Sequence, residues 1–152
     1  FEHRGDIAGR RVAWVGDGNN MCNSYIEAAS LLGFELRVAT PPEFAPVACG
    51  GAVLLTEDPH EAVAGADLVV TDVWASMGME KEEQDRRAAF AGYQLNDETV
   101  GLAKADCLVL HCLPAHRGEE VTNEIADSKN SVIFDQAENR LHAQKALLSL
   151  IM

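Results

Sequence analysis

Six short, mainly apolar runs limit how this sequence can fold more than any other feature. They read RVAWVG (11–16), ELRVAT (35–40), AVLLT (52–56), ADLVVTD (66–72), DCLVLHC (106–112) and SVIFD (131–135). None of them alternates strictly between apolar and polar residues, and continuous runs of this kind are typical of strands that are covered on both faces. We therefore expect a sheet with a layer of helices on each side.

Segments with helical spacing separate these runs. The apolar face of the first one consists of Met21, Tyr25, Ala28 and Leu32. Asn19 or Asn20 can cap its start, and Gly33 can cap its end. The repeated alternation of strand and helix predicts an α/β fold with a mostly parallel sheet, in three layers, over a single domain spanning residues 1–152. In such a fold, ligands bind beyond the carboxyl ends of the strands.

Two further segments have a helical pattern without a matching strand. Residues 78–93 are polar on most sides and are bounded by Gly78 and Gly92, which predicts a solvated helix. Residues 137–152 predict a long helix with a leucine-rich end. We expect that end to pack on something outside this sequence, because a large apolar surface is rarely left open to water.

Charge and cysteine content exclude several classes of function. The 152 residues include 24 acidic and 12 basic ones, and the net charge of -12 disfavours binding to nucleic acid or to an anionic membrane surface. The four cysteines form no CxxC pair, which favours a reducing, cytoplasmic location. The first residues, FEHRGDIAGRR, contain neither an apolar signal core nor an initiator methionine. We expect the sequence to be the interior of a longer protein.

The first strand end that could bind a ligand is GDGNN (16–20), where a glycine turn joins a strand to a helix as in a dinucleotide site. The third glycine of that motif would fall at Met21, and the next strand ends in VATPP (38–42), without an acidic residue for a ribose hydroxyl. A nicotinamide or flavin role is therefore disfavoured, and no cofactor is expected. Asn19 and Asn20 could hold a carboxylate or could simply cap the helix.

The second strand end is TDVWASMG (71–78). Asp72 and Ser76 could bind a substrate ammonium group there, although both are also common turn residues. Arg140, near the start of the final helix, could make a surface ion pair or could bind a phosphate or carboxylate.

The third strand end is HCLP (111–114). Cys112 could be a functional thiol, although a cysteine at the end of a buried strand is more often inert. The spacing of His111, Cys112 and His116 matches no zinc site, so no metal is expected. The hypothesis that Cys112 is the nucleophile of a cysteine hydrolase lacks a clear partner histidine.

Taken together and in order, five motifs resemble one family. VGDGNN, TDVWASMG, GYQLN, HCLPAHRGEEV and AENR are similar to the C-terminal, ornithine-binding half of the ornithine carbamoyltransferases, over essentially the whole chain. The HCLP and SMG motifs are the most specific of these. The resemblance implies a Rossmann-like α/β domain. It also implies transfer of a carbamoyl group from carbamoyl phosphate to the side-chain amine of L-ornithine, which gives L-citrulline and phosphate.

The resemblance also implies roles for individual residues on the acceptor side. Asn20 and the backbone of Met77 would receive the ornithine carboxylate, and Asp72 and Ser76 would meet its α-amino group.

Cys112 and Asp72 would lie near the reacting side-chain amine of ornithine, where Cys112 would bind and orient without forming a covalent bond. The backbone of Cys112 and Leu113, with the guanidinium of Arg140, would face carbamoyl phosphate. His111 is expected to be structural.

The family builds most of its carbamoyl phosphate site from an N-terminal domain with a Ser-Thr-Arg-Thr motif, and that motif does not occur in this sequence. We therefore expect this chain alone to show no appreciable carbamoyl transfer, and the intact protein to be a homotrimer. Three other acceptors remain open as alternatives: aspartate, putrescine and acylated ornithine. A non-catalytic amino-acid-binding module is the alternative from a different class.

Overall fold

The computed structural model describes residues 2–47, 53–75 and 83–152. Its centre is a five-stranded sheet in which every neighbouring pair is parallel and the order is β3-β2-β1-β4-β5. The strands are β1 (Arg11–Val15), β2 (Glu35–Ala39), β3 (Val53–Thr56), β4 (Leu68–Thr71) and β5 (Leu108–His111). All five lie within runs that the sequence predicts to be strands.

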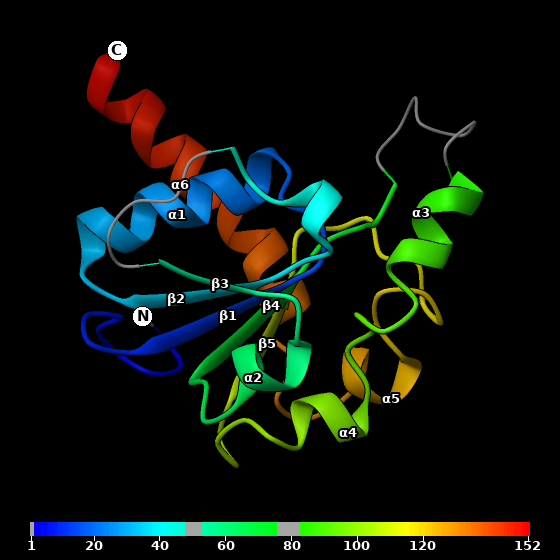
Figure 1. The fold of residues 1–152 in the computed structure, drawn as a ribbon. Coiled ribbons are helices and arrows are strands. Elements are labelled where there is room, and N and C mark those ends of the chain that lie inside the picture. Colours follow the sequence, from blue (N-terminus) through cyan, green and yellow to red (C-terminus); the bar gives the residue numbers. More distant parts are fainter. Residues whose placement is uncertain (1, 48–52, 76–82) are drawn as a thin grey trace.

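Six α-helices and one 3-10 turn accompany the described strands, and two of the helices follow the last strand. They are α1 (Asn20–Leu32), η1 (Pro42–Phe44), α2 (Pro59–Val63), α3 (Glu83–Ala89), α4 (Asp97–Val100), α5 (Asn123–Ala126) and α6 (Ile133–Ile151). Helices α1 and α6 lie on one side of the sheet, and α2, α4 and α5 lie on the other (Figure 1). The three-layer, Rossmann-like α/β architecture predicted from the sequence is confirmed.

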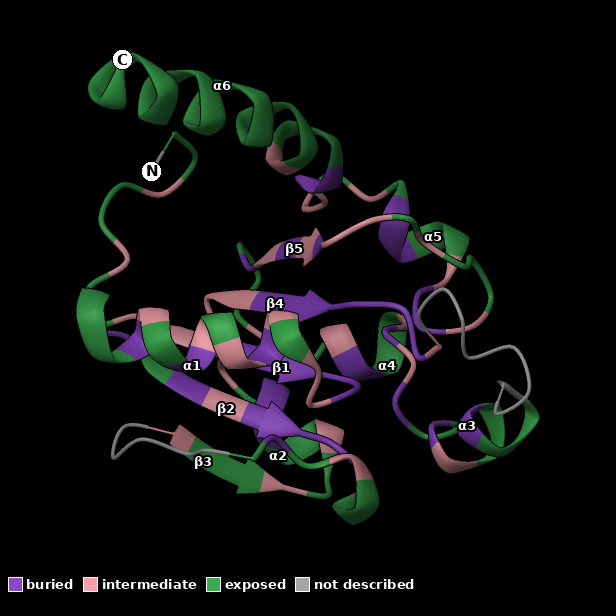
Figure 2. Ribbon diagram, turned by 90° about the horizontal axis from the view of Figure 1, so that it is seen from above, coloured by how far each residue is buried: buried purple, intermediate pink, exposed green. Residues whose placement is uncertain are grey.

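The central strands are buried because both of their faces are covered. Val12 and Trp14 of β1 pack on the α1 side, and Ala13 and Val15 pack on the α2 side, all with no exposed surface. Figure 2 shows the same for β4, most of which is buried. Two apolar clusters result, one on each face of the sheet.

Helix α1 is capped at both ends as the sequence predicts. The side chain of Asn19 accepts hydrogen bonds from the N–H groups of Met21 and Cys22, at 2.9 and 3.1 Å. Gly33 ends the helix in the left-handed conformation, at φ 72°, which glycine adopts without strain. Asn19 is therefore the cap, and Asn20 is the first residue of the helix.

The prediction of a sixth strand at 131–135 is wrong. Ser131 forms an isolated bridge with Val109, and helix α6 begins at Ile133. Val132 and Ile133 are buried, but Phe134 is 65% exposed. A run with only two buried residues fits the first turn of a helix as well as a strand, and periodicity does not distinguish the two in so short a segment.

The two remaining helix predictions are confirmed where the structure describes them. Helix α3 lies within the predicted range 78–93, of which residues 78–82 fall outside the described part. The leucine-rich end of α6 is exposed, with Leu147 at 58% and Leu150 at 84% (Figure 2). In the described ranges, no helix has both the length and the apolar character that crossing a bilayer requires.

Candidate functional site

The order of the strands places a topological switch point at β1 and β4. Within the sheet, β2 and β3 lie on one side of β1, and β4 and β5 lie on the other side. Parallel sheets bind ligands in the crevice that forms outside the carboxyl ends of the strands at such a point. The described residues that follow these strands belong to the GDGNN, TDVWASMG and HCLP motifs, so all three motifs begin at the same end of the sheet, with residues 76–78 outside the described part.

A cleft of about 970 Å³ opens at this edge. Its walls come from the start of α1, the ends of β4 and β5, and the first turns of α6. The lining residues include Asn20, Asp72, Cys112, Leu113 and Arg140. These are five of the seven residues that the family resemblance singles out, and they come from four separate parts of the chain.

Asp72 is fixed at the switch point by the helix cap. The Nδ2 group of Asn19 donates a hydrogen bond to Oδ2 of Asp72, at 3.1 Å, while Oδ1 of Asn19 caps α1. Asp72 is only 7% exposed, and it lies on the wall of the cleft. A buried carboxylate held in this way favours a cationic ligand.

Cys112 lies close to this carboxylate. Burial, together with the charge of Asp72, raises the pKa of the Cys112 thiol to about 12. Burial is also the main cause that raises the pKa of Tyr25 on α1, followed by the electrostatic effects of Cys112 and Asp72. At neutral pH, Cys112 is therefore an uncharged thiol, which can orient a ligand but is a poor nucleophile.

The HCLP turn is anchored from inside the protein. Nε2 of His111 lies 2.9 Å from Oε1 of Glu120, and the side chains of both residues are fully buried. The N–H of Leu113 donates to Nδ1 of His111, also at 2.9 Å. Because that N–H is occupied, the backbone group that Leu113 can offer a ligand is its carbonyl oxygen.

Arg140 reaches the cleft from the second turn of α6. It is exposed, and it lines the same cleft as Asn20 and Asp72. An accessible guanidinium on the wall of a cleft can bind a phosphate or carboxylate through two parallel hydrogen bonds.

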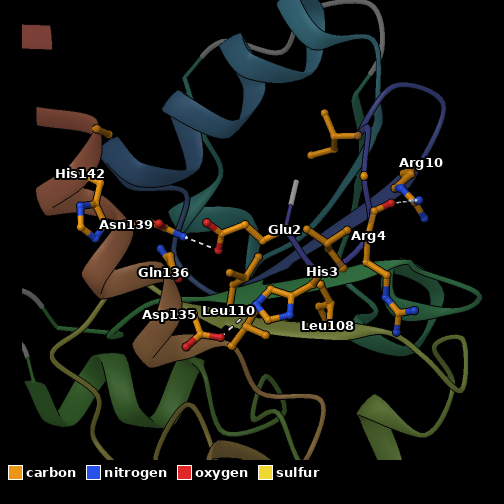
Figure 3. A pocket seen from close by; sticks show the side chains of 15 residues that line it. Glu2, His3, Arg4, Arg10, Leu108, Leu110, Asp135, Gln136, Asn139 and His142 are labelled. Carbon is orange, nitrogen blue, oxygen red and sulfur yellow. Dashed lines mark hydrogen bonds and ion pairs between the residues drawn. The ribbon is translucent and has the colours of Figure 1, made fainter. Parts of the chain in front are cut away.

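A second hollow of about 500 Å³ lies between the N-terminal segment and α6 (Figure 3). Its floor is apolar, formed partly by Leu68, Leu108 and Leu110. Polar groups at its rim pair with one another, such as His3 with Asp135 at 2.9 Å. It contains none of the predicted site residues and lies away from the carboxyl ends of the strands, so the cleft is the better candidate site.

One group of potential metal ligands occurs among the described residues. His116, Glu119 and Glu120 offer ligand atoms within 4.8 Å of one another. Two of them already have partners: Glu119 pairs with Arg87 at 2.6 Å, and Oε1 of Glu120 accepts from His111 and from the N–H of His116. None of the three is a predicted site residue, although His116 also lines the cleft.

Comparison with known proteins identifies the family. The sequence model of the family described as "Aspartate/ornithine carbamoyltransferase, Asp/Orn binding domain" matches residues 8–151. This chain belongs to the aspartate/ornithine carbamoyltransferase family. Among its curated relatives, an ornithine carbamoyltransferase from Methylococcus capsulatus is 58% identical over all of this chain. The anabolic ornithine carbamoyltransferase of Pseudomonas aeruginosa is also 58% identical, over 99% of the chain.

Solved structures of carbamoyltransferases agree with this assignment. The ornithine carbamoyltransferase from Pyrococcus furiosus superimposes with a TM-score of 0.90 over 98% of this chain, at 49% identity. The chain spans about half the length of the curated relatives that it matches, namely 53% of the M. capsulatus protein and 51% of the P. aeruginosa protein.

Two predicted carbamoyltransferase site residues cannot be placed in this cleft. Ser76 and Met77 of the SMG motif lie outside the described residues. The other five lie on the walls of the cleft, but their roles towards a substrate stay predictions.

The sequence did not predict the buried ion pair between Arg86 and Asp17. Nη1 of Arg86 donates to Oδ2 of Asp17 and to the carbonyl of Trp74, at 2.7 Å in both cases. The guanidinium also lies 4.6 Å from the ring centroid of Phe44. Asp17 and Arg86 are 69 positions apart. The single available signal was an arginine within a helix that is otherwise solvated.

Proposed function

We propose that this chain is the ornithine-binding half of an ornithine carbamoyltransferase, which carbamoylates the side-chain amine of L-ornithine. One observation carries the proposal: five residues implied by the family resemblance line a single cleft at the switch point of the sheet. The match to named ornithine carbamoyltransferases at 58% identity supports ornithine over other acceptors.

The charges of the cleft suit an amino acid with a second amine. Asp72 is a buried carboxylate that can bind an ammonium group, and Asn20 supplies an amide beside the N-terminus of α1, where a carboxylate is favoured. Cys112 directly follows β5, feels the charge of Asp72 and would pack against the reacting end of the ligand.

The chemistry requires the acceptor amine to lose a proton before it attacks. An alkyl amine has a pKa near that of lysine, about 10.4, so a base must assist. The thiol of Cys112 is already protonated at neutral pH, so it cannot accept that proton. We propose that Asp72 assists the loss of this proton and that Cys112 orients the amine.

Carbamoyl phosphate would lie on the side of Leu113 and Arg140. The Leu113 carbonyl can accept a hydrogen bond from the carbamoyl NH₂ group, and the Arg140 guanidinium can stabilise the developing oxyanion and the departing phosphate.

The rest of the donor site would come from the remaining length of the protein. We propose that residues 1–152 form a single ornithine-binding domain, that an N-terminal carbamoyl phosphate-binding domain completes the active site, and that the intact enzyme is a cytoplasmic homotrimer. The exposed leucine-rich end of α6 offers apolar surface for such contacts. The chain alone would then show no appreciable carbamoyl transfer.

An amide-resolved NMR titration with L-ornithine tests the acceptor assignment, with L-aspartate and putrescine as controls. We expect shifts around Asn20, Asp72 and Cys112 with ornithine and not with the controls. Asn20→Ala should weaken binding, whereas Asn23→Ala, on the same helix but outside the cleft, should not.

A stronger response to aspartate or putrescine would replace ornithine as the acceptor. Shifts confined to residues outside the cleft would overturn the site itself. Citrulline formed at enzyme-like rates by this chain alone would contradict the need for a second domain.

A further inference from the structure

We propose that His111 is a positioning residue, whose neutral imidazole holds the Leu113 peptide and thereby directs Cys112 and the Leu113 carbonyl into the cleft. This inference rests on the proposed function for its catalytic meaning. The geometry on which it depends is independent of any substrate.

His111 links two buried hydrogen bonds across its ring. Nδ1 lies 2.9 Å from the nitrogen of Leu113, two residues further along the chain, and Nε2 lies 2.9 Å from Oε1 of Glu120. The side chains of His111 and Glu120 have no exposed surface. Water therefore cannot replace either partner without a rearrangement of the turn.

The two partners determine which nitrogen carries the proton. A backbone N–H can only donate, so Nδ1 of His111 must present its lone pair to Leu113. Nε2 then carries the proton, and this N–H donates a hydrogen bond to the Glu120 carboxylate. A second proton, on Nδ1, would set two donors against each other at the Leu113 peptide.

Glu120 is the fixed end of this arrangement. Its Oε1 also accepts from the N–H of His116, at 2.6 Å, so one carboxylate oxygen ties together both ends of the turn. Glu120 precedes the short bridge of Val121 with Leu95, which attaches this segment to the domain.

The segment that His111 holds is the one that would face the substrates. Leu113 has a φ of 53°, a left-handed conformation that is unfavourable for a residue other than glycine because of its Cβ atom. Cys112 and Leu113 both line the cleft. The hydrogen bond from Leu113 to His111 stabilises this unfavourable conformation and leaves the Leu113 carbonyl for the ligand.

Two substitutions test the two hydrogen bonds of the His111 ring separately. In His111→Asn, Oδ1 takes the place of Nδ1 and can still accept from Leu113, but nothing reaches Glu120. In His111→Gln, Nε2 takes the place of the imidazole Nε2 and can still donate to Glu120, but no acceptor remains for Leu113. Each variant removes one buried hydrogen bond, so each serves as the control for the other.

The first readout is hydrogen exchange of the Leu113 amide, together with mass-spectrometric alkylation of Cys112, both in the 152-residue chain without ligand. We expect His111→Gln to speed both processes by roughly tenfold or more, since one hydrogen bond of about 1.4 kcal/mol is lost. His111→Asn should stay within roughly threefold of the unsubstituted chain. Equal effects of the two variants would overturn the proposal.

A second measurement does not require either variant to fold. The imidazole ¹⁵N spectrum of the unsubstituted chain should show His111 protonated at Nε2 and unprotonated at Nδ1. A proton on Nδ1 would overturn the proposal. If the tautomer and exchange results agree with it but ornithine produces no shifts in the cleft, the proposed function fails and the positioning role stands.

Discussion

Among single residues, Cys112 and Asp72 illustrate how a site can be set by proximity. Burial is the main cause that suppresses ionisation of the thiol, and the neighbouring Asp72 carboxylate, which is held by the cap of α1, adds to it. The pKa of Cys112 therefore depends on a residue 40 positions earlier in the chain.

Asp72→Asn should lower the pKa of Cys112 from about 12, because it removes a neighbouring negative charge. Burial remains, so the pKa should stay above the ordinary thiol value of 9.0. The pH dependence of Cys112 alkylation by iodoacetamide measures this. Asp85→Asn, at an exposed position on α3, is the matched control and should have no effect. An unchanged or raised pKa in Asp72→Asn would contradict the electrostatic account.

Among the elements, α3 is attached to the domain by a buried ion pair. Arg86 reaches Asp17, which follows β1, and both side chains are nearly buried. Burial raises the pKa of Asp17, and the hydrogen bond and charge of Arg86 oppose that shift. Removing the arginine would leave a carboxyl group buried without its cation.

Arg86→Met should lower the free energy of unfolding by about 3–5 kcal/mol, the usual cost of breaking a buried ion pair. Adding Asp17→Asn should recover part of the loss, because the uncompensated charge is then gone. Urea unfolding followed by circular dichroism measures both.

Arg87→Met is the control for this pair. Its partner Glu119 and its own side chain are more exposed, at 27% and 51%, so the loss should be at most about 1 kcal/mol. Similar losses for Arg86→Met and Arg87→Met would show that burial of the Asp17 pair has no special weight.

For the molecule as a whole, buried thiols make stability depend on alkaline pH. Burial is the main cause that raises the pKa of Cys107 from 9.0 to about 12, and Cys112 behaves in the same way. The folded pKa lies above the unfolded value. The stability linked to these thiols is therefore fully present below pH 9 and is lost as the pH rises towards 12.

We expect the free energy of unfolding to fall between pH 9 and pH 12, with Cys107 contributing up to about 4 kcal/mol of the fall. Urea unfolding at several alkaline pH values measures the slope. Cys107→Ala should be less stable than the unsubstituted chain at pH 8 but should show a shallower slope. Parallel slopes for the two proteins would mean that Cys107 does not contribute.

The sequence by itself determined the strands, the layers and the three motifs that meet at the cleft. Five of the six apolar runs contain strands, because a run that is covered on both faces has a pattern that survives without tertiary information. The strand prediction for residues 131–135 is wrong because only Val132 and Ile133 are buried, and two buried residues fit a helix as well as a strand.

Tertiary structure alone decided which groups work together. Sequence could not choose between Asn19 and Asn20 as the cap; in the structure Oδ1 of Asn19 caps α1 while its Nδ2 donates to Asp72, 53 positions away. The same is true of Asp17 with Arg86, since hydrogen bonds between distant residues leave no periodic trace. The sequence predicts a structural role for His111, but its partner Glu120 and the burial of both side chains follow only from the tertiary structure.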